Sequence, residues 1–255
     1  MGEDAPVDPT DLLQRLAAPP LFILGTASSG SNWVYEVLTA HPEVAGTRES
    51  WLFEDLAGAP PEEARSRSTE VLSEALGPGH RFVVEKSTAH IFRAGEIFAA
   101  WPEARFVHVL RDGRDVAIRV WFRSSKLPPR WVHVFGKSLG GAADAWARSV
   151  DAARSLRELA TDNFLEITFE DSNIRRRAAA ARLLAFIGAP FDDDLLDDIL
   201  STDDHRLDKP VDLNAWKEHY SIWRALRFHQ VAGETLIKTH YEDDKTWWFK
   251  PFKRF

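Results

Sequence analysis

The hydrophobic pattern of the chain consists of short, almost continuous apolar runs separated by longer amphipathic segments. Four runs predict buried strands, because they are short and several are rich in β-branched or aromatic residues: 21–24, 82–84, 105–110 and 164–168. The amphipathic segments predict helices at 34–38, 60–76, 94–100, 115–123 and 142–159, with further helices toward the C-terminus. Strands that alternate with helices and are almost continuously apolar indicate an α/β fold with three layers, in which helices cover both faces of a central parallel sheet.

The chain is predicted to form one domain at residues 19–245, because 255 residues with 44% hydrophobic composition lie near the upper size of a single domain. Residues 1–18 form an N-terminal arm with a short helix at 11–17, which Pro19-Pro20 ends. Residues 246–255, TWWFKPFKRF, form a basic and aromatic tail. We expect the tail to pack onto the domain; a contact with a ligand or with a second copy in a homodimer is the alternative.

Composition excludes several classes of protein. The formal net charge of −7 gives no overall positive field, so we expect neither a nucleic acid nor a membrane as partner. The absence of cysteine excludes disulfide scaffolds, thiolate catalysis and cysteine metal sites, and the nine histidines show no paired ligand spacing, so we expect no metal. The sequence shows neither a signal-peptide pattern nor an apolar stretch long enough for a bilayer, which predicts a cytoplasmic protein.

A loop rich in small and hydroxylated residues follows the first predicted strand and leads into a helix. Such a loop lets backbone N–H groups converge on an anion, and the helix N-terminus adds its dipole. An ATP or GTP loop places lysine directly after its second glycine, where this chain has Ser31, so this is not a standard nucleotide triphosphate loop. A serine-capped turn without ligand is the alternative. The candidate binding residues are Thr26, Ala27, Ser28, Ser29, Gly30, Ser31, Asn32 and Trp33.

Two further polar clusters are expected near that loop, because each follows a predicted strand and ligands collect beyond the carboxyl ends of parallel strands. Lys86, within Glu85-Lys86-Ser87, is placed to stabilise negative charge on a leaving oxygen. Arg111 ends a strand and Arg119 lies on the following helix, so the two guanidinium groups are placed to grip one phosphate. Ordinary ion pairs, between Glu85 and Lys86 or between Arg114 and its acidic neighbour, are the alternatives.

A fourth cluster, Arg48-Glu49, follows a short apolar segment. A cation beside a carboxylate keeps the carboxylate ionised, which suits a general base that receives a hydroxyl proton. We therefore name Glu49 as the candidate base and Arg48 as its cation, with a surface ion pair as the alternative.

Taken in this order, the clusters resemble those of the sulfotransferases that use 3′-phosphoadenosine 5′-phosphosulfate (PAPS). Residues 24–33 are similar to the phosphosulfate loop, and residues 48–49 with Phe53 are similar to the Lys-Glu segment of glycan-type members. Residues 85–87 are similar to the Glu-Lys-Ser segment, and residues 111–116 to the segment whose arginine binds the 3′-phosphate. Residues 167–171 and 183–188 give a weaker fifth match.

The resemblance implies a sulfotransferase fold with a P-loop-like site and no metal. It implies transfer of a sulfuryl group from PAPS to a hydroxyl, or as a second choice an amine, of a small molecule or glycan, leaving 3′-phosphoadenosine 5′-phosphate (PAP). The implied roles are as follows: the 26–32 loop with Ser29 and Ser31 for the 5′-phosphosulfate, Lys86 for the bridging oxygen, Glu49 for the acceptor's proton, Arg111 and Arg119 for the 3′-phosphate, Trp33 for adenine, and Lys209 or Lys217 over the nucleotide. Four further residues are candidate acceptor walls because they follow the strand-end motifs, with a place in the core as the alternative: Trp51, Trp121, Trp131 and His133.

Two positions depart from the family pattern. Ser28 stands where the loop residue is usually basic, and Arg119 stands where serine is usual. The lost charge-assisted contact at Ser28 is worth about 1.5–3 kcal/mol unless Lys86 or Arg48 replaces it. Two alternatives to a sulfotransferase therefore stay open. One is a non-catalytic nucleotide-binding or interaction protein of the same fold. The other is a P-loop kinase, which the missing loop lysine argues against.

Overall fold

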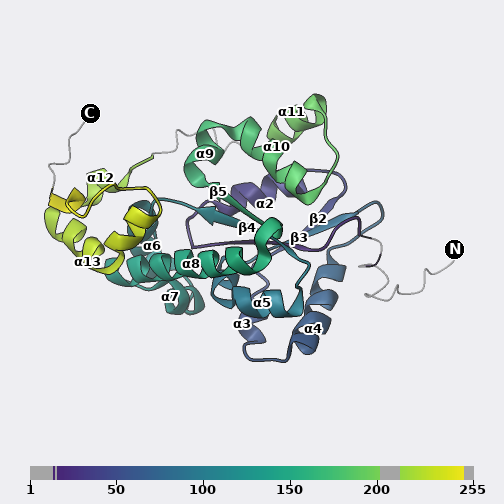
Figure 1. The fold of residues 1–255 in the computed structure, drawn as a ribbon, viewed down its shortest axis with the longest axis horizontal. Helices are drawn as coiled ribbons and strands as arrows, with labels where there is room; N and C mark the ends of the chain where they lie inside the picture. The colour runs from purple at the N-terminus through teal and green to yellow at the C-terminus, as the bar shows by residue number, and fades with distance from the viewer. Residues whose placement is uncertain (1–13, 15, 202–212, 250–255) are drawn as a thin grey trace.

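A five-stranded parallel sheet forms the centre of the molecule (Figure 1). The computed structural model describes residue 14, residues 16–201 and residues 213–249. Along the sheet the strands follow the order β2-β3-β1-β4-β5, and every paired strand runs parallel to its neighbour. The predicted α/β class is thus confirmed. The strands are β1 (Leu21–Gly25), β2 (Val44–Arg48), β3 (Phe82–Lys86), β4 (Arg105–Leu110) and β5 (Phe164–Thr168).

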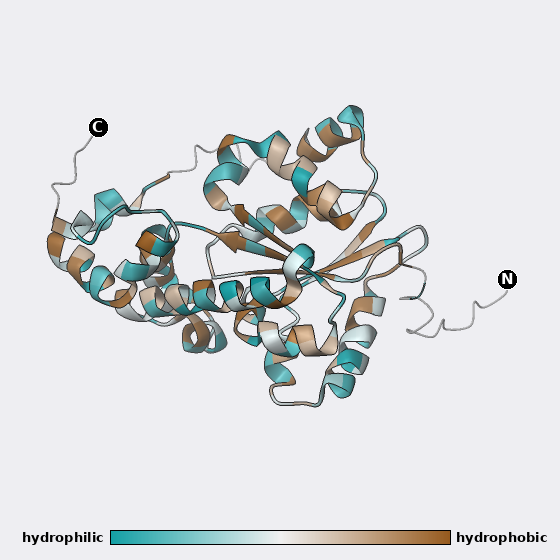
Figure 2. Ribbon diagram, viewed as in Figure 1, coloured by the Kyte–Doolittle hydropathy of each residue, from teal (hydrophilic) through white to brown (hydrophobic). Residues whose placement is uncertain are grey.

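Helices cover both faces of this sheet, and the side chains of β1 explain why. Leu21 and Ile23 belong to one apolar cluster and Phe22 and Leu24 to another, as expected when successive side chains point to opposite faces. The strands are the most continuously hydrophobic part of the ribbon in Figure 2. The first face carries α2 (Ser31–Thr39), α9 (Phe169–Ile174), α10 (Arg176–Ile187) and α11 (Asp193–Ser201); the second carries α3 (Leu52–Asp55), α4 (Pro61–Glu74), α5 (Ala94–Ala100) and part of α8 (Leu139–Ala160).

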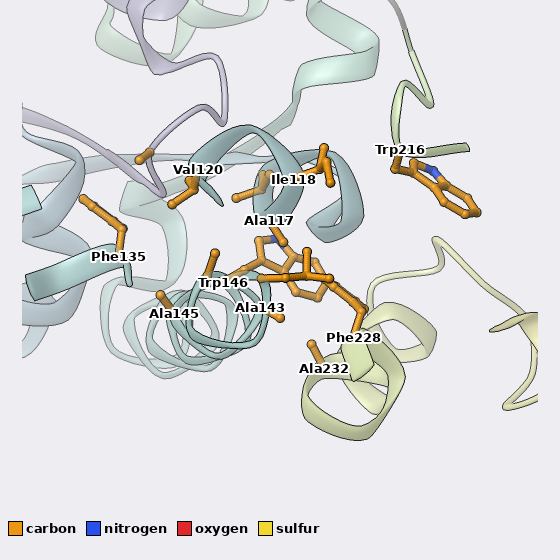
Figure 3. Close-up of a cluster of buried hydrophobic side chains, with 14 of the residues drawn as sticks. Ala117, Ile118, Val120, Phe135, Ala143, Ala145, Trp146, Trp216, Phe228 and Ala232 are labelled. Carbon is orange, nitrogen blue, oxygen red and sulfur yellow. The ribbon is translucent and has the colours of Figure 1, made fainter. Parts of the chain in front are cut away.

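A third apolar cluster gathers around the first half of α8 (Figure 3). Trp146 of α8 is its centre and packs between Ala117 and Phe228, which come from helices on either side. Trp247 is only 3% exposed and packs against Phe228, so the start of the C-terminal tail packs onto the domain. The remaining elements are α6 (Gly113–Arg123), α7 (Pro129–Phe135), α12 (Trp216–His219), α13 (Ile222–Lys238) and the short 3-10 helices η1 (Thr88–Arg93), η2 (Ser124–Lys126), η3 (Thr161–Asn163) and η4 (Trp247–Phe249).

The structure adds one strand to the four that were predicted. β2 escaped the hydrophobic pattern because it lies at the edge of the sheet and only Val44 and Ala45 are buried in it. The predicted helix at 11–17 falls mostly outside the described residues. No helix in the described part of the chain is both long and apolar enough to cross a membrane.

Candidate active site

One cavity of about 770 Å³ opens where the carboxyl ends of the strands meet. Parallel strands place these ends at one edge, and the register confirms it: Ile23 lies opposite both Lys86 of β3 and Val107 of β4. Most of the predicted site residues meet in this cavity. They are Ala27, Ser28, Gly30, Ser31, Asn32, Trp33, Arg48, Glu49, Lys86, Arg111 and Arg119.

The loop before α2 depends on a glycine at position 30. Gly30 caps the helix with φ of 98°, a left-handed conformation that side chains rarely adopt. A Cβ there would also meet the Phe169 ring at 2.4 Å. Ser28 has a positive φ as well, and the N–H of Ser29 donates to the carbonyl of Thr26 at 3.1 Å. Thr26 and Ser29 are therefore buried parts of the loop's framework, while its outer residues line the cavity.

The two proposed catalytic groups are in direct contact. Glu49 directly follows β2, and its N–H donates to the carbonyl of Lys86 at 2.7 Å, which extends the pairing of β2 with β3 by one residue. The Lys86 ammonium donates to Oε1 of Glu49. Arg48, which the sequence suggested as the cation beside Glu49, instead lies 5.6 Å from the ring of Tyr35. The cation in contact with the Glu49 carboxylate is thus Lys86, and Arg48 lines the same cavity.

Backbone strain marks the segment that carries the carboxylate. Glu49 and Trp51 have φ of 53° and 56°, both in the left-handed region. For residues other than glycine this costs on the order of 1–3 kcal/mol each, and such conformations cluster at functional sites. Contacts with the surrounding structure must therefore hold this turn in its strained conformation.

Arg111 directly follows β4 and lines the cavity. Only 3% of the residue is exposed; it donates to the carbonyl of Ser28 at 3.1 Å and lies 3.8 Å from the Phe169 ring. Its contact with Asp115 is long, at 3.5 Å. Burial and the nearby charge of Arg119 lower the pKa of Arg111, although Asp115 opposes this shift. An anion bound in the cavity would stabilise the charged guanidinium and so raise this pKa again.

Buried polar atoms without a hydrogen-bond partner gather around the cavity. Buried polar groups in native proteins are normally paired, so such a cluster indicates a ligand that supplies the missing partners. Donors dominate the set, which fits a group carrying several phosphate or sulfate oxygens. Its members are Trp33 Nε1, Glu49 Oε2, Thr88 Oγ1 and Arg111 Nε, all from residues that line the cavity.

Several predicted residues lie away from the cavity lining. Trp51 is buried and packs edge-on against Trp131 at 5.4 Å, so Trp131 and not Trp51 faces the cavity. Trp121 packs beside Phe122, and His133 is exposed on α7. The Lys217 ammonium lies 5.8 Å from the Trp216 ring, and Lys209 is outside the described residues.

Other lining residues were not predicted. Phe169 and Asn173 were missed although they stand one helical turn apart just after β5, at a strand end like the predicted clusters. Thr88 follows Lys86 and was missed because a single threonine carries no pattern. Val120, Arg123, Leu127 and Pro128 complete the wall on the side of α6 and α7.

Comparisons with known proteins assign the chain to a family. A model of the sulfotransferase family matches residues 61–193, just over half of the chain. This chain belongs to the sulfotransferase family. The matched region contains Lys86 and Arg111 but begins after the 25–33 loop and Glu49. A search of curated protein sequences found no match.

Solved structures of sulfotransferases share the fold. The sulfotransferase domain of the olefin synthase from Synechococcus PCC 7002 has a TM-score of 0.56 at 17% identity, covering 86% of this chain and 95% of that one. Mouse sulfotransferase SULT7A1, complexed with PAP, has a TM-score of 0.55 at 13% identity, covering 91% and 90%. Sulfotransferase STF9 from Mycobacterium avium has a TM-score of 0.59 at 10% identity, covering 90% and 79%. Membership of this family supports the transfer of sulfuryl groups in general.

Proposed function

We propose that this sulfotransferase moves a sulfuryl group from PAPS to a hydroxyl group of a small molecule or glycan. The observation that carries the proposal is one cavity in which the Glu49–Lys86 pair, the glycine-containing loop and the buried Arg111 come together. The mouse neighbour and retinol dehydratase were both crystallised with PAP, which supports the same donor here.

The residues present fit the donor. The N-terminus of α2 with Gly30 and Ser31 is a suitable site for the 5′-phosphosulfate, because its unpaired N–H groups and dipole favour an anion. Arg111, with its unpaired Nε, and Arg119 are suited to the 3′-phosphate, since guanidinium binds phosphate through two donors. The indole N–H of Trp33 is a further unpaired donor in the same cavity.

The chemistry needs little more than positioning and charge stabilisation, by analogy with phosphoryl transfer. When bound, PAPS supplies an activated sulfuryl group. Oε2 of Glu49, which has no partner, accepts the proton of the acceptor hydroxyl. Lys86, whose side chain is 5% exposed, holds its positive charge beside that carboxylate and stabilises the negative charge that develops on the bridging oxygen.

Ser28 leaves the loop without its usual basic residue, and other cations of the cavity are proposed to compensate. Arg48 and Arg123 both line it, whereas Lys86 is already paired with Glu49. Of the two replacements considered from the sequence, Arg48 is therefore the better one.

An apolar wall faces these charged groups and suits the acceptor. Val120, Leu127, Pro128 and Trp131 form it, and a flat indole ring packs equally well against a phenol or the apolar face of a sugar.

The direct test is transfer from radiolabelled PAPS to a panel of phenols and sugars. We expect Glu49→Gln to lower kcat by about 10²–10⁴-fold, the usual contribution of a general base, without changing PAP affinity. Glu36→Gln, an exposed glutamate on α2, is the matched control and should keep full activity. Unchanged turnover in Glu49→Gln would refute the base assignment.

A binding measurement separates the alternatives. Calorimetry should give tighter binding of PAP than of ATP, because only PAP carries the 3′-phosphate expected at Arg111. PAP binding without transfer to any acceptor would instead favour the non-catalytic nucleotide-binding protein that Ser28 suggests. Magnesium-dependent ATP turnover would favour the kinase.

A further inference from the structure

A fully buried histidine lies between two glutamates directly behind the Glu49–Lys86 pair. Nδ1 of His90, on η1, lies 2.9 Å from Oε2 of Glu85, the residue before Lys86 on β3. Its Nε2 lies 3.1 Å from Oε2 of Glu54 on α3. Burial opposes the charged imidazole, yet the two carboxylates outweigh it and raise the pKa of His90 to about 10. The cluster thus joins a buried histidine to carboxylates from two other elements.

Glu85 connects this cluster to the strained turn that carries Glu49. Its Oε1 accepts hydrogen bonds from Ser50 Oγ at 2.8 Å and from Ser87 Oγ at 2.6 Å. Ser87 Oγ in turn accepts from the N–H of Trp51 at 3.4 Å. Ser50 and Trp51 therefore both depend on Glu85, either directly or through one hydroxyl.

The turn itself is short and conformationally costly, since Glu49 and Trp51 both have left-handed φ angles. A turn of this kind persists only where its surroundings over-determine it. Two hydrogen bonds constrain the turn: Ser50 Oγ donates to Glu85, and the N–H of Glu49 donates to the carbonyl of Lys86. All contacts of the cluster lie behind the cavity, and none of Glu85, His90 and Glu54 lines it.

We infer that Glu85, His90 and Glu54 form a positioning cluster for the transfer reaction. The cluster holds the Glu49–Trp51 turn in place and thereby sets where the Glu49 carboxylate meets Lys86 and the acceptor. This inference rests on the proposed function for its effect on turnover, but the hold on the turn is a separate property. The proposed donor site is formed by the α2 N-terminus and Arg111, which none of the three cluster residues contacts. We therefore expect donor binding to be independent of the cluster.

The experiment uses Glu85→Ala, which removes both serine contacts and leaves His90 paired with Glu54. Amide hydrogen exchange should become faster at Glu49 and Trp51, and kcat should fall about 100-fold, as expected for a slightly misplaced reacting group. The affinity for PAP, measured by calorimetry, should stay unchanged. Glu85→Gln should restore slow exchange and most of kcat, because its amide oxygen still accepts from both serines.

The matched control is Glu166→Ala on β5. Glu166 also lies 2.9 Å from a buried histidine, His108, but on β5, the edge strand on the opposite side of the sheet from β2 and β3. This variant should lose stability without changing kcat or the exchange of the turn. Ser50→Ala removes a single hydroxyl and gives a second, milder test if Glu85→Ala does not fold; it should speed exchange of the same two amides and lower kcat less.

Turnover is measured with radiolabelled PAPS and with naphthol and N-acetylglucosamine as probe acceptors. Unchanged exchange in the Glu85 and Ser50 variants would overturn the inference, and so would faster exchange with full kcat. An equal fall of kcat in Glu166→Ala would overturn it too, because the effect would then follow general stability. If the wild-type protein transfers no sulfuryl group to either probe, the proposed function loses support, while the exchange measurement still decides whether the cluster holds the turn.

Discussion

Arg111 and Arg114 stand three residues apart where β4 passes into α6, and both are almost completely buried. Arg114 is fully paired: Asp112 accepts from it at 2.7 and 3.0 Å, Glu242 accepts from its other end, and the rings of Trp216 and Trp247 lie 3.9 and 4.9 Å away. Arg111 has an unpaired Nε and only a long contact with its carboxylate.

Their protonation equilibria differ in the same way. Burial opposes the charge of Arg114, but Asp112 and Glu242 outweigh it and raise its pKa, whereas burial and Arg119 lower the pKa of Arg111. A buried charge is stable when its partners come from the fold, and it is ready for a ligand when they do not. The pairing of each arginine therefore predicts a structural role for Arg114 and a binding role for Arg111, although both lie in one sequence motif.

The largest effect is expected for Arg114→Ala. The substitution leaves Asp112 and Glu242 without their cation, and breaking a buried ion pair typically costs about 3–5 kcal/mol of stability. Urea unfolding measures this loss. The control is Arg67→Ala, whose pair with Glu70 is exposed and should be worth less than about 1 kcal/mol. Equal losses in the two variants would contradict the structural role of Arg114.

Arg111→Ala should have the opposite profile. We expect PAP affinity to fall by about 1.5–3 kcal/mol, the value of a charge-assisted hydrogen bond, while stability changes little because the side chain has few partners to lose. Calorimetry with PAP and urea unfolding give the two numbers. If this variant unfolds as readily as Arg114→Ala, the two arginines have the same role and the comparison fails.

Glu170 contacts Asp112, which lies between Arg111 and Arg114 in the sequence, and its titration should make stability depend on pH. It accepts from the Asp112 N–H at 3.2 Å and from the Tyr241 hydroxyl at 2.8 Å, and burial raises its pKa in spite of these bonds. The folded state thus holds this proton more tightly than the unfolded state. Stability from this group is therefore greatest below its unfolded pKa and declines as pH rises through its folded pKa.

The substitution Glu170→Gln removes that titration. The difference in unfolding free energy between wild type and variant should shift in favour of the variant as pH rises above about 4.5, and then level off. Urea unfolding at a series of pH values tests the slope. A constant difference across the series would show that Glu170 does not titrate as inferred.

The smallest effect is expected for Arg119→Ser. Arg119 lines the cavity but is exposed, so its contribution to PAP affinity should resemble that of a surface ion pair, about 0.2–1 kcal/mol. Calorimetry with PAP at low and high salt measures it. A loss as large as that of Arg111→Ala would mean that the two guanidinium groups share the phosphate equally.

The sequence was informative wherever one local pattern decides the outcome. Such patterns predicted the four apolar strands, the helix after the loop and the clusters at the strand ends. From these elements alone, Lys86 and Arg111 were correctly expected to lie near each other. β2 was missed because an edge strand with two buried residues has almost no hydrophobic signal.

The partners of charged residues could not be predicted in this way, because they come from distant parts of the chain. Glu85 and Lys86 are adjacent, yet one pairs with His90 and the other with Glu49. Likewise Arg114 pairs with Asp112 and not with its neighbour Asp115, which contacts Arg111. Spacing along the chain identifies residues that are able to act, whereas packing decides which of them meet.

The parallel order of the sheet also has a consequence for biosynthesis. The cavity lining extends from Ala27 to Asn173, and Phe169, which lies under Arg111, comes from the segment after the last strand. A nascent chain that has emerged through β3 contains Glu49 and Lys86 but lacks the guanidinium and the ring beneath it. The cavity is therefore completed only when translation has passed β5, so a truncated product ending earlier would contain Glu49 and Lys86 without the complete cavity.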